Sequence, residues 1–198
     1  MKNISNITGG QNRKACILFL SVLVAAGIIA GAVFEVKSSS SLSCWLHQYF
    51  APAYSGSTIM QIMANTFKSS LLFVAAAFLT GFFAFGQPLG AALLVYRGFG
   101  IGASAAFMYS TEGSAALPEV AVLILPKAIA VVLISILAVR ELMKASGAVL
   151  AWWISEGSRD DNRISFRLYC LKFTVLIILS FIVSAADAAL NYAFSALR

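Results

Sequence analysis

Residues 69–85 contain no charged side chain, and this uncharged run limits what the chain can fold into more than any other feature. The predicted span of 67–85 is long enough to cross a hydrocarbon core of about 30 Å as a helix. A second apolar pattern, residues 89–109, follows the helix-breaking sequence Gly-Gln-Pro at 86–88. Because lipid cannot hydrogen-bond to exposed backbone, so short a connection predicts an antiparallel hairpin with its tip at the membrane surface. We expect this tight hairpin to be the core of the fold.

The composition places the whole chain in a membrane. Hydrophobic residues make up 60% and charged residues 11%, whereas soluble domains average about 45 to 50% and 25%. The net charge of +6 does not indicate a nucleic-acid partner, because the basic residues lie between apolar runs rather than on a soluble face. The first partner that the sequence predicts is therefore the lipid bilayer.

Three further apolar runs, residues 15–34, 119–139 and 173–192, bring the predicted transmembrane helices to five. The chain is thus expected to be a polytopic all-α protein, with residues 1–198 forming a single integral membrane domain. Residues 15–34 also resemble a cleaved signal, with Ala-Gly-Ala at 30–32. A run of 20 apolar residues is longer than a usual signal core, which favours an uncleaved helix.

The two long connections, residues 35–66 and 140–172, are expected to hold amphipathic helices that lie on the membrane surface. A partner-binding groove in residues 35–66 is the functional alternative. Pro126, inside the fourth predicted span, predicts a kink. The residues that carry the three amphipathic patterns are Leu42, Trp45, Leu46, Tyr49 and Phe50; Ile59, Ile62, Met63 and Phe67; and 142–154, which includes Trp152 and Trp153.

The distribution of basic residues predicts the orientation. With the N-terminus in the cytoplasm, residues 35–66 lie outside, residues 140–172 lie inside and the C-terminus is extracytoplasmic. Nine Lys and Arg residues then lie on the cytoplasmic side, namely Lys2, Arg13, Lys14, Arg140, Lys144, Arg159, Arg163, Arg167 and Lys172. The other side holds Lys37, Lys68 and Arg198.

Three ionisable residues, Arg97, Lys127 and Asp187, fall inside predicted spans, where a charge costs about 2.5 to 3.5 kcal/mol and marks a pathway or a pair. A rise of 1.5 Å per residue places Lys127 roughly 20 Å and Asp187 roughly 22 Å above the cytoplasmic surface, so we expect them to pair. In the alternative, Asp187 reaches outer water and Lys127 bonds a carbonyl freed by Pro126. Arg97, at about 12 Å, is expected to snorkel to the inner headgroups.

Small residues predict where helices pack closely. Gly27 and Gly31 form a GxxxG pattern, although they are also consistent with ordinary small residues of a membrane helix. A face at Ser180, Ser184 and Ala188 has the same character. The remaining glycines expected at helix contacts are Gly86, Gly90, Gly98, Gly100 and Gly102.

The sequence offers no set of residues typical of an active site. Its cysteines, Cys16, Cys44 and Cys170, are widely separated, and His47 is its one histidine. We therefore expect no metal, no cofactor and no enzymatic activity.

The hairpin region resembles the stage II sporulation protein M family, through Asn65 and Lys68 before a span, Gly81, Gly86, Pro88 and Gly90 around the break, and RGFGIG at 97–102. The resemblance implies a scaffold in the cell membrane of an endospore-forming bacterium. Such a scaffold acts in forespore engulfment and holds the peptidoglycan hydrolases called stage II sporulation proteins D and P. A small transporter or permease-like subunit, motivated by the three intramembrane charges, is the alternative, and homo-oligomerisation stays open.

Overall fold

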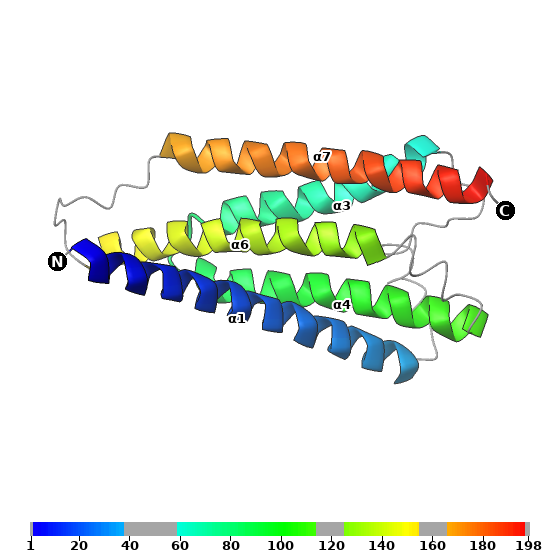
Figure 1. The fold of residues 1–198 in the computed structure, drawn as a ribbon, viewed down its shortest axis with the longest axis horizontal. Helices are drawn as coiled ribbons and strands as arrows, with labels where there is room; N and C mark the ends of the chain where they lie inside the picture. Colours follow the sequence, from blue (N-terminus) through cyan, green and yellow to red (C-terminus); the bar gives the residue numbers. More distant parts are fainter. Residues whose placement is uncertain (1, 38–58, 114–124, 155–165, 197–198) are drawn as a thin grey trace.

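The computed structural model describes residues 2–37, 59–113, 125–154 and 166–196, and every regular element in these ranges is a helix. The all-α prediction is therefore confirmed. The start of α1 and the end of α7 lie at opposite ends of an elongated bundle (Figure 1). The helices are α1 (Lys2–Lys37), α3 (Ile59–Thr80), α4 (Gly86–Glu112), α6 (Leu125–Ile154) and α7 (Phe166–Ala196).

Four of these helices contain a segment long and apolar enough to cross a membrane: Ala15–Phe34, Met63–Thr80, Gly86–Ser110 and Arg167–Ala193. The chain is therefore a multi-pass membrane protein. Helix α6 runs alongside the other four (Figure 1) and is the candidate fifth crossing, although charged residues interrupt its described part.

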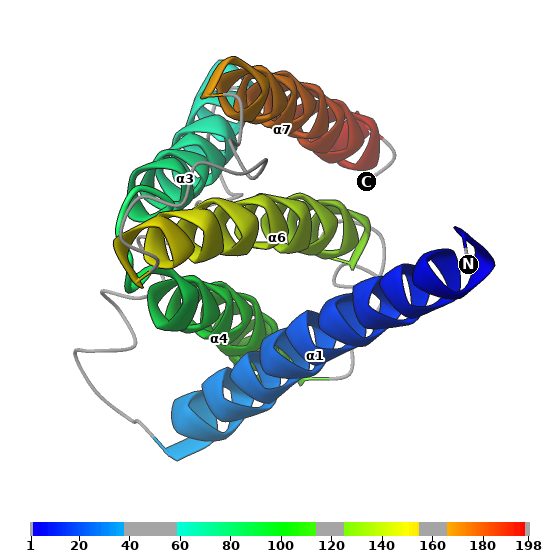
Figure 2. The ribbon, with the colours of Figure 1, turned by 90° about the vertical axis from the view of Figure 1, so that its left-hand side faces the viewer.

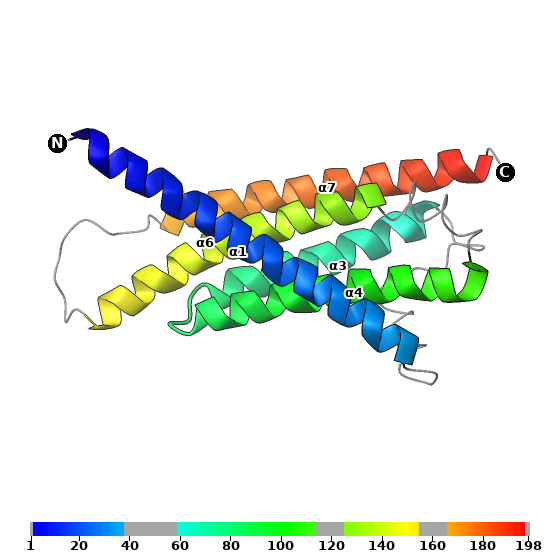
Figure 3. The ribbon, with the colours of Figure 1, turned by 60° about the horizontal axis from the view of Figure 1, so that its bottom comes forward.

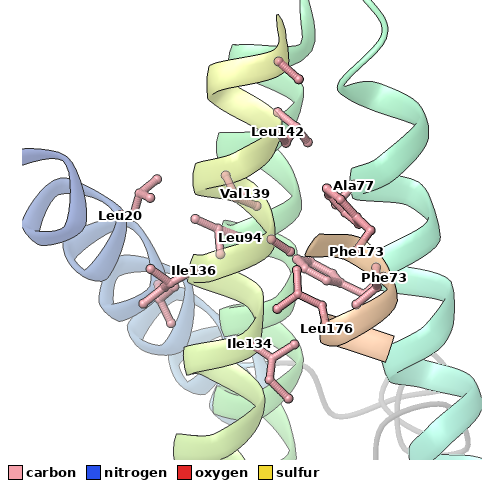
Figure 4. Close-up of a cluster of buried hydrophobic side chains, with 14 of the residues drawn as sticks. Leu20, Phe73, Ala77, Leu94, Ile134, Ile136, Val139, Leu142, Phe173 and Leu176 are labelled. Carbon is pink, nitrogen blue, oxygen red and sulfur yellow. The ribbon is translucent and has the colours of Figure 1, made fainter. Parts of the chain in front are cut away.

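Helix α6, and not the hairpin, is the centre of the bundle. It contacts each of the other four described helices, and Figure 2 shows it between the α3–α7 pair and the α4–α1 pair. In Figure 4, side chains of α6 such as Ile136 and Val139 lie between Leu20 of α1 and Phe73 of α3. The prediction that the α3–α4 hairpin forms the core is therefore wrong, because its two helices diverge from the turn and α6 packs against both.

The break between α3 and α4 comes earlier than predicted. Residues 81–85 form the turn, and α4 already begins at Gly86. Pro88 lies in the first turn of α4, where its missing N–H leaves no bond unmade, so it begins the helix rather than ending the one before. At Gly81 a side chain would meet the hydroxyl of Tyr169, which itself donates to the carbonyl of Phe78 (3.0 Å).

Two predicted surface helices are instead continuations of the long helices. The pattern that starts at Ile59 is the first part of α3, because no helix-breaking residue separates it from the span. Residues 142–154 likewise continue α6, and Leu142 is fully buried in the core rather than lying on a surface. Glu141, which lies just after the predicted end of the span at residue 139, is neutralised by lysines of α6 and α7.

Two other predictions concern residues outside the described ranges. The amphipathic pattern at 42–50 falls wholly among them. The described part of α6 begins at Leu125, so Pro126 lies in its first turn and the two sides of the expected kink are not both described.

Candidate functional site

The ionisable groups inside the bundle centre on an ion pair between α6 and α7. The ammonium Nζ of Lys127 lies 2.7 Å from Oδ2 of Asp187, and the two side chains are 18% and 1% exposed. The salt bridge that the sequence analysis expected is therefore present. A carboxylate this deeply buried requires a matched charge or several donors, and it has both.

Two polar neighbours complete this network. Thr66 of α3 donates its hydroxyl to Oδ2 of Asp187 (2.8 Å) and accepts a bond from Nζ of Lys127 (3.0 Å). Asn191, one turn along α7, donates to Oδ1 of Asp187 (3.3 Å) and to its backbone carbonyl (2.8 Å). Both carboxylate oxygens are thus occupied, and the network joins α6 and α7 to α3, which lies much earlier in the sequence.

The face of α7 that carries Asp187 is polar along much of its length and buried against α3. Ser184 donates to the backbone carbonyl of Met63 in α3 (2.6 Å), and Ser180 donates to the carbonyl of Leu176 one turn earlier in its own helix (2.9 Å). Ser180, Ser184 and Ala188 are all buried, in keeping with the expected packing face. Interhelical hydrogen bonds such as that from Ser184 to Met63 are one of the forces that hold helices together in lipid, where apolar burial alone does not.

Arg97 does not snorkel to the inner headgroups as expected. It is buried between α4 and α3, where its two terminal nitrogens donate to the hydroxyls of Ser69 (2.8 Å) and Ser70 (3.2 Å). Its guanidinium carbon also lies 5.6 Å from the ring centre of Phe73, within cation–π range. The depth of Arg97 along α4 alone does not determine where its side chain points, because a face of α3 that carries hydroxyl groups lies beside it.

The hydroxyls of α3 were missed by the sequence analysis, although their spacing carried a signal. Thr66, Ser69 and Ser70 are three and four residues apart, so they share one helical face. The first binds the Lys127–Asp187 pair, and the other two bind Arg97. One helix thus solvates both intramembrane cations from positions one turn apart.

The expected close-packing glycines lie at contacts between backbones. Gly27 and Gly31 of α1 face Gly98 and Phe99 of α4, and a side chain at either position would overlap α4 backbone atoms. Gly98 and Gly102 face α1 in the same way, with Gly102 against the backbone of Ile28. The two GxxxG patterns therefore pack on each other where α1 crosses α4 obliquely (Figure 3).

The other glycines of α4 serve a different neighbour. At Gly90 an added Cβ would lie 3.0 Å from Cδ2 of Leu142 and 3.1 Å from Cγ1 of Val139, both on α6. At Gly86 it would meet the carbonyl oxygen of Thr80 at the end of α3 and lie 3.0 Å from Ser146 of α6. Gly100 is buried and its carbonyl accepts a bond from Ser104 (2.8 Å). Helix α4 therefore presents one glycine face to α1 and another to α6.

The arrangement as a whole is suited to holding helices in register. Its charged groups bind one another or hydroxyl groups of the same chain. Among the residues that the structure describes, no group of three His, Cys, Asp or Glu side chains lies together. His47 and Cys44 fall outside those residues.

Comparison with known protein families finds a match. The model of the family described as stage II sporulation protein M matches residues 16–187, from the first predicted span to Asp187 of the buried pair. No curated protein sequence and no solved structure matches the chain.

Proposed function

Because this chain belongs to the stage II sporulation protein M family, a family of sporulation membrane proteins, we propose that it is a non-enzymatic scaffold for engulfment. In this role it holds peptidoglycan hydrolases at the engulfing membrane. The partners expected from the family are stage II sporulation proteins D and P.

The proposal rests on one observation: the buried charged side chains are bound to other side chains of the same protein. Lys127 and Asp187 bind each other and Thr66, while Arg97 binds two serines of α3. A transport pathway needs polar groups that can exchange partners with a solute, whereas these groups are engaged in helix–helix contacts. Their arrangement favours a rigid scaffold over the small transporter.

The proposed orientation places the N-terminus in the cytoplasm and the C-terminus outside. It rests on the nine basic residues assigned to the cytoplasmic side. The α3–α4 turn then faces the cytoplasm, and the end of α1, the start of α3 and the end of α4 lie toward the outer side, where wall hydrolases act. A reporter fused after Arg198 should read as extracytoplasmic and one inserted at Asp160 as cytoplasmic; a cytoplasmic signal from both would contradict the orientation.

Affinity capture from sporulating cells tests the scaffold directly. The tagged chain should recover the hydrolases, and Trp45→Ala with Tyr49→Ala, on the proposed outer side, should lower the yield several-fold. Trp153→Ala is the matched control, because it removes an exposed aromatic side chain near the opposite end of the bundle. Recovery of no wall hydrolase by a chain that is present at its normal level would contradict the proposal.

A further inference from the structure

A second ionic cluster lies away from the buried pair, toward the α3–α4 turn. One carboxylate oxygen of Glu141 binds Nζ of Lys144 (2.7 Å), and the other binds Nζ of Lys172 of α7 (2.6 Å). The carboxylate thereby holds ammonium groups from two helices close together. The lysine side chains are 48% and 40% exposed, whereas that of Glu141 is 16% exposed.

The surroundings of this cluster are strongly positive. Glu141 is the one carboxylate in the described part of α6, and the one in α7, Asp187, lies far along that helix. Arg140 is half-buried beside Glu141, and Arg167 is exposed five residues before Lys172. Each ammonium has three donors, of which the contact to Glu141 uses one. The lysine pair can therefore bind a further anion without giving up its carboxylate.

The depth of the cluster follows from the hairpin turn. Phe83 and Phe85 in this turn are 60% and 78% exposed, as suits aromatic side chains inserted at a membrane interface. Ser146 of α6 donates to the carbonyls of Phe83 (2.9 Å) and Ala84 (3.2 Å), which fixes the level of the turn on α6. Glu141 precedes Ser146 by five residues, or about 7.5 Å along the helix axis. Flexible lysine side chains at this depth reach back to the phosphates of the same leaflet.

We propose that Lys144 and Lys172, which lie on either side of the Glu141 carboxylate, bind the phosphate group of an anionic phospholipid. Lysine binds phosphate as a compact charge, and basic sites between transmembrane helices favour anionic headgroups. The excess positive charge selects an anionic headgroup over a zwitterionic one. The site contains residues of α6 and α7, so a bound lipid joins these two helices at the end of the bundle away from Asp187.

The test compares lipids that differ in headgroup alone. Purified full-length chain in neutral detergent is titrated with phosphatidylglycerol or with phosphatidylcholine of the same acyl chains, and binding is measured by native mass spectrometry. Phosphatidylglycerol should bind more tightly. Lys144→Gln and Lys172→Gln should each weaken its binding about fivefold, and the double variant roughly 25-fold. Lys68→Gln, at an exposed lysine of α3, is the matched control and should leave binding unchanged.

Glu141→Gln separates lipid binding from a structural role of the ion pairs. It leaves both ammonium groups and removes a negative charge, so it should bind phosphatidylglycerol at least as tightly as the wild type, even where it unfolds earlier. Equal loss of binding in Glu141→Gln and in the double lysine variant would overturn the proposal, as would wild-type binding by the double variant. If inorganic phosphate displaces the lipid at concentrations similar to those of the lipid itself, the site binds a soluble anion and the assignment to lipid is overturned.

Discussion

Removing either partner of the Lys127–Asp187 pair should destabilise the bundle, and the two removals should differ in size. Lys127→Ala leaves a carboxylate that is 1% exposed, whose remaining donors among the described residues are Thr66 and Asn191. Asp187→Ala leaves an ammonium that is 18% exposed and keeps its bond to Thr66. Breaking a buried pair costs about 3 to 5 kcal/mol. We therefore expect about 4 kcal/mol for Lys127→Ala and, because of the partial exposure, about 2 kcal/mol for Asp187→Ala.

The double variant decides whether these losses come from one interaction. Without either charge, the loss should be smaller than the sum of the single losses by about 2 kcal/mol. Unfolding by sodium dodecyl sulfate from mild detergent micelles, followed by circular dichroism, measures all three free energies. Lys68→Ala removes an exposed lysine of α3 and should change stability by less than about 0.5 kcal/mol. Strictly additive losses would refute the coupling.

Three further predictions concern other parts of the bundle. Gly102→Leu should lower the free energy of unfolding by at least about 1 to 3 kcal/mol, because the new side chain would overlap the backbone of Ile28. In the same detergent titration, Ala92→Leu, at an exposed site of the same helix, should have a mild effect. Equal tolerance of the two changes would contradict the α1–α4 contact. Arg97→Lys should lower the free energy of unfolding by about 1 kcal/mol, because one ammonium cannot reproduce the two hydrogen bonds to the α3 hydroxyls. Arg97→Met should cost no more, because it also removes a buried charge. A far larger loss in Arg97→Met, measured by the same unfolding assay, would contradict this. Glu141→Gln should cost about 1 kcal/mol in the same detergent titration, because it removes the carboxylate that binds lysines of α6 and α7, all three side chains being partly exposed. Unchanged stability would contradict a structural role for these ion pairs.

The sequence was sufficient for features that depend on distance along one helix. The Lys127–Asp187 pair follows from the rise per residue, since both residues lie at one depth in neighbouring spans. Close approach at Gly98 and Gly102 follows from the absence of side chains, which is a local property. That their partner is the Gly27–Gly31 face of α1 depends on the crossing of two helices, which no local pattern contains.

The features that were mispredicted depend on neighbours in space. Arg97 was expected to need headgroups, but two serines of α3 bind it inside the bundle. The fourth span was predicted to end at residue 139, yet α6 continues past Glu141, whose charge is matched by Lys144 and Lys172. In both cases the side chain that neutralises or solvates the charge comes partly or wholly from another helix, and sequence periodicity does not show which faces of two helices meet.

Localisation of the hydrolases in sporulating cells tests the scaffold most directly. Fluorescent fusions of stage II sporulation proteins D and P are followed in cells with the chain and in cells from which its gene has been deleted. The account predicts that in the deletion strain the fusions disperse and engulfment stops, and that the wild-type chain restores both. Normal localisation and complete engulfment in the deletion strain would contradict the account.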